Sequence, residues 1–276
     1  MPLILSLTQP TTIPLEVDDI RLETVRDQTI DQIKSTEIQY GNQRRPVGEF
    51  FSISGSAAED NQMIWQGDCS RVKLIGCGLT EGSVIVEGDA GMHLGAEMRG
   101  GHIVVRGNAQ DWVGAEMHGG RIEVLGNAGH LIGAAYRGAR QGMTGGEILI
   151  HGSAGNEVGH TMRRGLIAVA GRTGDAAGFG MRAGTLVLCG ATGIRIGAGM
   201  NRGTIVCCDL EHDADMLPTF KWGCRYAPEF MRIYFQHLIQ NDFPVPPACL
   251  QASFDRYSGD FLESGRGEIL IRVSDL

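Results

Sequence analysis

The chain has 276 residues, a formal net charge of −8 and a pI near 5.5. This acidic balance argues against nucleic acid as the main partner, because nucleic-acid-binding surfaces are rich in Lys and Arg. No apolar run reaches the ~18 residues of a membrane span, and the apolar Leu3–Leu7 lacks the preceding cations of a signal peptide. Seven cysteines without a C-x-x-C pair indicate reduced thiols and a cytoplasmic protein. Pairing of Cys189 with Cys208, which lie one repeat apart, stays open.

The first segment, residues 1–60, alternates weakly between apolar and polar positions and is punctuated by prolines. We expect it to form strands and a cap over the array that follows, because an uncovered sheet end exposes unpaired backbone groups. Within it, residues 30–38 are compatible with either a short strand or a short helix.

Residues 61–210 form a repeat array with a period of 19 residues. Three positions recur in register: a glycine after each short apolar segment, a second glycine seven residues later, and a methionine three residues further on. The three series are Gly88, Gly107, Gly126, Gly152, Gly171, Gly190; Gly95, Gly114, Gly133, Gly159, Gly178, Gly197; and Met98, Met117, Tyr136, Met162, Met181, Met200. A single interval of 26 residues predicts a seven-residue insertion near 139–145.

Each repeat unit contains alternating apolar residues, such as Ile103 and Val105, which predict a half-buried strand. Helices are excluded by the glycine density, because each interior glycine costs ~1 kcal/mol relative to alanine. A unit this short buries its apolar face only against neighbouring copies of itself. We therefore expect an all-β chain folded as a right-handed parallel β-helix, a solenoid of ~19-residue coils about 4.8 Å apart. Left-handed hexapeptide helices and nonapeptide rolls have periods of which 19 is not a multiple.

Residues 211–276 form a C-terminal extension that we expect to close the array. Pro228 suits the first turn of an amphipathic helix over about 228–240, and the prolines from Pro244 onward end it. Residues 256–260 and 267–271 are typical of a closing hairpin. The predicted apolar face of the helix consists of Phe230, Ile233, Tyr234, His237 and Leu238.

The sequence predicts no catalytic residue and no metal site of its own. The Gly-x-Gly segments all occur at one repeat phase with no helix after them, so they indicate corners rather than a dinucleotide-binding loop. His212, flanked by Glu211 and Asp213, reads as a polar turn, with cation binding as the alternative. Glu97 and Glu116 fall one unit apart, but no further acid, base or nucleophile continues their column.

A basic column follows the methionine positions directly. Side chains stacked about 4.8 Å apart repel one another when all are cationic, unless anions or carboxylates lie opposite. The column therefore indicates a ladder that docks an acidic partner surface or a polyanionic tail, with side chains splayed into water as the alternative. The ladder consists of Arg99, Arg137, Arg163 and Arg182, with His118 and Asn201 at the same phase. The outward strand positions of the later units are apolar, which predicts a cover formed by the C-terminal helix, the N-terminal segment or a further polypeptide of an assembly.

The repeat G-x-Φ-x-Φ-x-G-x-A-G…G-x-x-M-x-x-G resembles the glycine-repeat domain at the C-terminus of the large glutamate synthase subunit. Over nearly the whole chain it is more similar to the C subunit of formylmethanofuran dehydrogenase, including its bacterial counterpart in the formyltransferase/hydrolase complex. The residues that carry the resemblance are 88–91, 95–101, their later copies, and 256–260.

The resemblance implies a non-catalytic scaffold subunit in tetrahydromethanopterin-linked one-carbon metabolism. Its partners would be the amidohydrolase-like A subunit, the B subunit and the formyltransferase, which is the D subunit. Metal, pterin and iron–sulfur centres would belong to these other polypeptides, and this chain lacks cluster-binding cysteine spacing. The chain itself is expected to bind no cofactor. In the bacterial complex the one-carbon carrier is a methanofuran-type cofactor with a polyglutamate tail, which the arginine ladder would suit.

Two alternatives remain open. A glutamate-synthase-like domain lining an ammonia tunnel would need neighbouring amidotransferase and flavin domains. A β-helix enzyme acting on polysaccharide would need clustered acids or arginines with calcium-ligand carboxylates on one sheet. The bacterial hydrolytic complex is favoured over the archaeal redox complex by family likeness alone.

Overall fold

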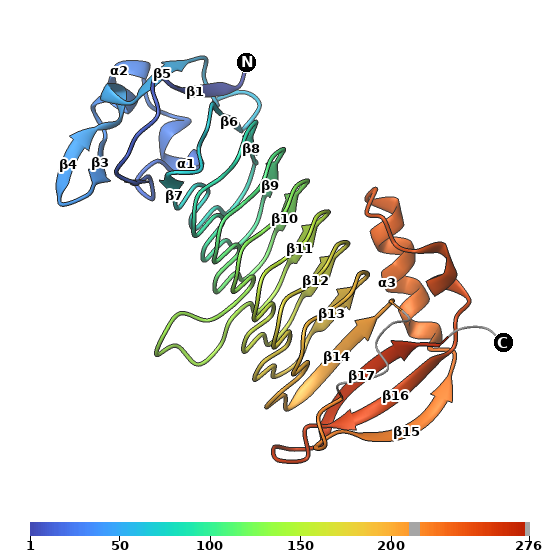
Figure 1. The fold of residues 1–276 in the computed structure, drawn as a ribbon. Helices are drawn as coiled ribbons and strands as arrows, with labels where there is room; N and C mark the ends of the chain where they lie inside the picture. The colour runs from blue at the N-terminus through green and yellow to red at the C-terminus, as the bar shows by residue number, and fades with distance from the viewer. Residues whose placement is uncertain (210–215, 274–276) are drawn as a thin grey trace.

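A large, mostly parallel β-sheet runs the length of the molecule (Figure 1). The computed structural model describes residues 1–209 and 216–273. Within them the sheet has 13 strands in the order β15-β16-β17-β14-β13-β12-β11-β10-β9-β8-β6-β1-β5. Their bounds are β1 (Leu3–Leu7), β5 (Phe51–Ser54), β6 (Gln62–Gln66), β8 (Ser83–Val86), β9 (His102–Val105), β10 (Arg121–Val124), β11 (Glu147–Ile150), β12 (Leu166–Val169), β13 (Thr185–Leu188), β14 (Arg202–Cys207), β15 (Lys221–Tyr226), β16 (Phe254–Gly259) and β17 (Arg266–Arg272). The predicted β-rich fold is confirmed.

Successive repeat units stack in residue-to-residue register. Ile122 of β10 pairs with Ile103 of β9, 19 residues earlier, and with Ile148 of β11, 26 residues later. A second, parallel ladder of single bridges joins the same units elsewhere along their length. Each unit therefore adds one strand to the sheet and one residue to the second ladder. The bridge residues are Cys69, Ala90, Ala109, Ala128, Ala154, Thr173 and Thr192.

Glycines of the repeat pack against methionines of the preceding unit. A Cβ built on Gly120 would lie 2.6 Å from the Cε of the fully buried Met98, and one on Gly184 would lie 2.9 Å from the Cε of Met162. Both glycines also have positive φ, which disfavours any residue with a Cβ. The G-x-x-M-x-x-G pattern thus places a long flexible side chain from one unit over the bare backbone of the next.

The insertion begins earlier than the sequence predicted. Met143, rather than Tyr136, continues the methionine series: its side chain is fully buried, and its carbonyl accepts a 2.8 Å hydrogen bond from the backbone N–H of Arg163. Tyr136 lies outside the column and stacks on Trp112, with 5.1 Å between ring centroids. The extra residues therefore lie between Gly133 and Met143 instead of near 139–145. The thioether fills the dry interior, whereas a buried tyrosine hydroxyl would require a polar partner.

The N-terminal residues cover the first unit of the stack (Figure 1). Residues 30–38, which the sequence left open, form a helix followed by a strand, and Thr29 caps that helix in a capping box with Gln32. A four-stranded sheet in the order β4-β3-β2-β7 joins this segment to the array. The elements are β2 (Leu15–Glu16), α1 (Leu22–Val25), α2 (Ile30–Ser35), β3 (Glu37–Tyr40), β4 (Gln43–Pro46), the 3-10 turn η1 (Val47–Glu49) and β7 (Val72–Lys73).

The C-terminal helix α3 (Glu229–Gln240) packs on the outward face of the later strands (Figure 1). Its buried side chains are Met231, Phe235 and Leu238, which form a second core with Leu149, Ala168, Val187 and Val206. The predicted apolar face is confirmed for Leu238, which is buried, and for Tyr234, which is partly buried and packs against this core. It was wrong for Phe230 and Ile233, which are 41% and 71% exposed. The second 3-10 turn, η2 (Pro247–Leu250), follows the helix.

The cysteines of this second core are thiols. Cys189, Cys208 and Cys249 are buried and free, and hydrogen bonds with the other two thiols, together with burial, raise the pKa of Cys208. The sequence left open whether Cys189 pairs with Cys208, and in the structure these two residues form no disulfide. Among the residues described, no helix has both the length and the apolar character needed to cross a bilayer.

Candidate functional site

The two acidic candidates, Glu97 and Glu116, have different surroundings in the structure. No group of three or more His, Cys, Asp or Glu side chains within residues 1–209 and 216–273 is arranged to hold a metal ion. Glu97 is exposed, and Glu116 accepts a 2.9 Å hydrogen bond from the backbone N–H of Tyr136, so it supports the insertion. His212 and its acidic neighbours lie outside the described residues.

Three of the four arginines predicted for the basic column lie in one column. Arg99, Arg163 and Arg182 occupy equivalent positions, because the backbone N–H of each donates to a carbonyl of the preceding unit at 2.7–2.8 Å. Thr144, rather than Arg137, fills the intervening position, as a direct consequence of the shifted insertion. Its hydroxyl lies 2.7 Å from Nδ1 of His118, one unit earlier. Arg99 is thus three units, about 14 Å, from Arg163, and Arg182 is one unit, about 4.8 Å, beyond it.

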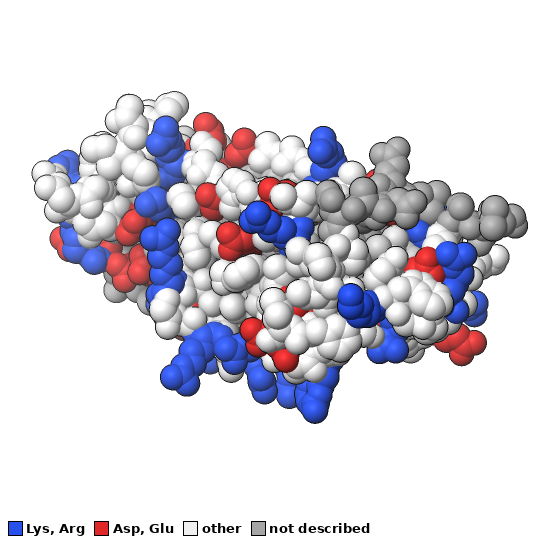
Figure 2. All heavy atoms as spheres, turned by 60° about the horizontal axis from the view of Figure 1, so that its bottom comes forward, with Lys and Arg blue, Asp and Glu red and all other residues white. Residues whose placement is uncertain are grey.

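Arg137 and Arg140 are exposed residues of the insertion, which projects from the edge of the stack at which the strands begin (Figure 1). We call the exposed arginines on this side the basic edge, and Figure 2 shows Lys and Arg side chains gathered along the lower margin of the molecule. Within the described parts of the chain, none of these guanidinium groups forms an ion pair. The edge therefore presents uncompensated positive charge in a chain whose net charge is −8. The residues are Arg99, Arg137, Arg140, Arg163, Arg164 and Arg182.

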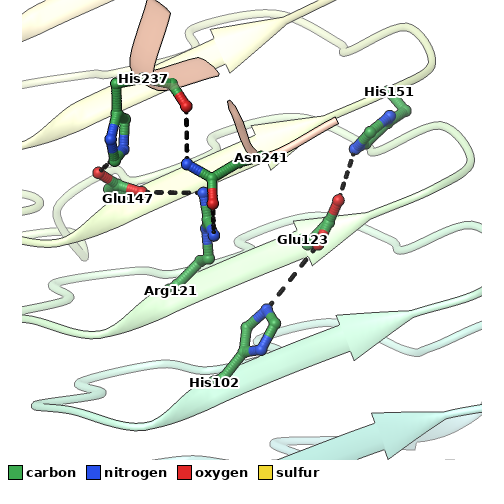
Figure 3. Close-up of polar contacts among 7 residues, drawn as sticks. All are labelled: His102, Arg121, Glu123, Glu147, His151, His237 and Asn241. Carbon is green, nitrogen blue, oxygen red and sulfur yellow. Dashed lines mark hydrogen bonds and ion pairs between the residues drawn. The ribbon is translucent and has the colours of Figure 1, made fainter. Parts of the chain in front are cut away.

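A polar network crosses the outward face of the sheet where the cover formed by α3 ends (Figure 3). His237 Nε2 of α3 lies 2.6 Å from Glu147 Oε1 on β11, and Glu147 Oε2 lies 3.4 Å from Arg121 Nη2 on β10. Arg121 Nη1 donates to Asn241 Oδ1 at 2.6 Å, and Asn241 Nδ2 donates to the His237 carbonyl at 2.7 Å. These four residues tie the end of the helix to two strands.

A second polar group lies beside the first (Figure 3). Glu123 on β10 has His151 Nε2 at 2.8 Å from Oε1 and His102 Nε2 at 3.8 Å from Oε2. Burial and the nearby Arg121 charge lower the pKa of His102, while Glu123 opposes this shift. The buried Nε2 of His102 has no hydrogen-bond partner. Sequence reasoning missed this group, although the mixed outward positions of β9 and β10 were its signal.

A groove lies between α3 and the glycine-rich edge of the stack. Its volume is about 580 Å³. Ile233, Tyr234 and His237 form the helix wall, and Glu147, Leu166 and Thr185 form the floor. The opposite wall is the backbone of Gly146, Gly165 and Gly184, with Arg164 of the basic edge beside them. We call this cavity the α3 groove.

Comparison with known proteins places these features in a family. A model of the GXGXG motif family matches residues 71–217. A crystal structure of the formyltransferase/hydrolase complex from Methylorubrum extorquens, in complex with methylofuran, contains a chain that matches with a TM-score of 0.90 and 30% identity. That match covers 98% of this chain and 100% of the other. The C subunit of a molybdenum-containing formylmethanofuran dehydrogenase from Methanothermobacter marburgensis is 46% identical over 83 residues. The chain belongs to the family of formylmethanofuran dehydrogenase C subunits.

The similarity to the curated members of this family covers about a third of this chain. The 83-residue alignment spans 30% of this chain and 21% of the molybdenum-containing relative. The C subunit of a tungsten-containing enzyme from the same organism is 39% identical over 97 residues, which is 34% of this chain and 36% of that relative. The chain thus spans about a fifth to a third of the length of these curated relatives.

Proposed function

We propose that this chain is a non-catalytic structural subunit of a formylmethanofuran dehydrogenase-like or formyltransferase/hydrolase complex. In this proposal its stacked units are the coils of a right-handed parallel β-helix, a stiff rod along which other subunits are positioned. The partners would be the amidohydrolase-like A subunit, the B subunit and the formyltransferase D subunit, which would hold any metal, pterin or iron–sulfur centre. The full-length match to a chain of the Methylorubrum extorquens complex supports a subunit role.

One observation carries the proposal: the parallel sheet is covered on its outward face along only part of its length. Parallel sheets occur almost only with both faces buried. Here α3 covers Leu149, Ala168 and their later counterparts. Beyond Leu149 the same outward column passes Glu123 and then continues through Val104, Ile85 and Ile64, which are only partly buried. We call these three side chains the outward stripe. A partner that covers it would complete the second layer of the sheet.

The basic edge has a separate role in this proposal. Its unpaired guanidinium groups would contact the anionic tail of a methanofuran-type carrier, such as a polyglutamate chain, or the acidic surface of a partner. Exposed arginines lying about 4.8 Å apart repel one another, and that repulsion is relieved when carboxylates lie between them. The spacing of Arg163 and Arg182 suits an extended polyanion better than a single ion.

The test of the scaffold role is co-expression with candidate A, B and D subunits, followed by native mass spectrometry. Val104→Asp is expected to remove this chain from the complex while leaving its far-UV circular dichroism unchanged. The matched control is Ile194→Asp, which also replaces a partly exposed aliphatic residue, 45% exposed, but away from the outward stripe. Normal assembly of the Val104 variant would contradict the proposed interface. Formyltransferase or hydrolase activity of the isolated chain would contradict the non-catalytic role.

The test of the basic edge uses a synthetic oligoglutamate peptide and fluorescence anisotropy. The double variant Arg163→Glu/Arg182→Glu is expected to bind the peptide at least tenfold more weakly than the unmodified chain. Arg172→Glu, which reverses an exposed charge in a different column, is the control. Equal affinity in the double variant and the control would remove the proposed contact.

A further inference from the structure

Helix α3 carries two apolar stripes, and only one of them is buried. Met231, Phe235 and Leu238 pack into the second core, whereas Ile233 is 71% exposed and Phe230 is 41% exposed. A helix that lies on a sheet normally turns polar residues outward. Exposed aliphatic and aromatic side chains clustered beside a concavity instead mark an interaction site. Ile233 forms one wall of such a concavity, the α3 groove, together with Tyr234 and His237.

The shape of the α3 groove suits a short length of polypeptide. Its volume of about 580 Å³ falls within the ~300–1,000 Å³ of typical ligand pockets. The wall opposite the helix is formed by Gly146, Gly165 and Gly184, each of which has positive φ and no side chain. A Cβ on any of these glycines would point into the preceding repeat unit, where it would lie within 2.9 Å of a methionine Cε, so the wall that faces the groove is bare backbone. An extended segment can lay its own backbone along such an edge, whereas a helix presents a surface covered by side chains.

The charges around the groove indicate the chemistry of a polypeptide that would bind in it. Glu147 on the floor already has partners: it forms an ion pair with Arg121, and its Oε1 lies 2.6 Å from Nε2 of His237. Arg164 at the wall has no ion pair within the described part of the chain, and Arg163 and Arg182 stand at the same edge. The uncompensated charge that faces an incoming chain is therefore positive. An occupant with carboxylates close to an apolar side chain complements both the apolar residues of the helix wall and the positive charge of Arg164.

We propose that the α3 groove holds an extended segment of a partner subunit in which an aliphatic or aromatic residue is flanked by Asp or Glu. The apolar side chain would pack against Ile233 and Tyr234, and a neighbouring carboxylate would pair with Arg164. This inference rests on the proposed function, because it requires a partner subunit, and it names the chemistry of one contact. Gln236 is exposed on the same helix and does not line the α3 groove, so it provides a control position.

The test begins with the intact complex, assembled in cells from this chain and its partner subunits. The photoreactive amino acid benzoylphenylalanine replaces Ile233, and the cross-linked peptide is identified by mass spectrometry. A cross-link to a different subunit of the complex, at a segment with an apolar residue beside Asp or Glu, is the expected result. A cross-link to a second copy of this chain, to a basic segment, or to no protein would overturn the inference.

Two variants then measure the contribution of the groove to assembly. Ile233→Asp and Arg164→Glu are each expected to weaken binding of the purified partner subcomplex at least tenfold. Gln236→Asp introduces the same side chain at an exposed position of α3 outside the groove and is expected to bind normally. Thermal melting of each variant checks that the fold is intact. If the chain never joins a complex, the proposed function fails. If it joins and the groove variants bind normally, only this inference fails.

Discussion

Gly138 and Gly146 have nearly the same backbone conformation in very different surroundings. Their φ angles are +91° and +89°. A Cβ on Gly138 in the insertion would meet nothing within 4 Å, whereas one on Gly146 would lie 2.6 Å from the carbonyl oxygen of Gly120 and 2.7 Å from Cε of Met117. Substitution of each by alanine therefore separates the cost of the backbone conformation from the cost of stacking.

The expected magnitudes follow from these contacts. Both substitutions place a Cβ at positive φ, at a cost of about 1–2 kcal/mol, and both gain about 0.4–1 kcal/mol by restricting the unfolded chain. Gly146→Ala alone also pushes a Cβ into the backbone of the preceding unit, where overpacking costs about 1–3 kcal/mol. We expect Gly146→Ala to be less stable than Gly138→Ala by about 1–3 kcal/mol.

The assay is urea unfolding of both variants and the unmodified chain, followed by far-UV circular dichroism under identical conditions. The free energy of unfolding is compared through the midpoint and the slope, because a change in slope would signal loss of cooperativity between stacked units. Equal stability of the two alanine variants would refute the claim that close stacking of the units excludes a side chain at Gly146.

Three further predictions concern the core, the outward face and the basic edge. Met143→Ala is expected to lower the free energy of unfolding by about 2–5 kcal/mol, and Tyr136→Ala by less, because only Met143 is fully buried. Burial and the Arg121 charge lower the pKa of His102 below its ordinary value of 6.5, so on acidification the unfolded chain binds a proton first. The stability owed to neutral His102 is therefore complete above pH 6.5 and decreases below it, and His102→Gln is expected to flatten this part of the profile. Binding of oligoglutamate to the basic edge is expected to weaken steeply as salt rises, because exposed charges are screened.

Each of these predictions has an outcome that contradicts it. Urea titrations in which Tyr136→Ala is the more damaging substitution would restore Tyr136 to the methionine column. An unchanged pH profile for His102→Gln between pH 5 and pH 7 would mean that another group carries the acid sensitivity. Peptide binding that is insensitive to salt would show that the contact is not made by exposed guanidinium groups.

The repeat could be recognised in the sequence because stacking requires the same residue types at the same positions of every unit. Each unit must turn at positive φ and must accept a side chain from its neighbour, so glycine and methionine recur at fixed intervals. The position of the insertion could not be predicted from the sequence in the same way. Tyr136 and Met143 both fit an apolar position near a regular interval of glycines, and only the hydrogen bonds to neighbouring units distinguish them.

The site features show the same division. The arginine ladder was predicted from spacing alone, and three of its four arginines occupy one column, because an exposed position in a regular stack follows the period. Arg137 lies outside the column because the insertion begins earlier than predicted, and Thr144 takes the equivalent position. The apolar face of α3 was misassigned because two stripes, one through Ile233 and one through Phe235, have helical spacing. Docking against the sheet selected the second stripe and left the first to line a groove.

Local periodicity was enough to establish a stacked β architecture, its strand positions, its glycine turns and the family resemblance. Contacts between distant residues were not encoded in that periodicity. Glu123 meets His102 and His151, which lie 21 residues before it and 28 after it, only because the neighbouring units place these side chains diagonally across from it. The α3 groove likewise exists only because the chain returns after its last unit and lays a helix across the earlier strands. The repeat pattern specifies the strands and turns of each unit. The contacts between side chains of different units, and the segments that cover the stack, depend on how the whole chain packs.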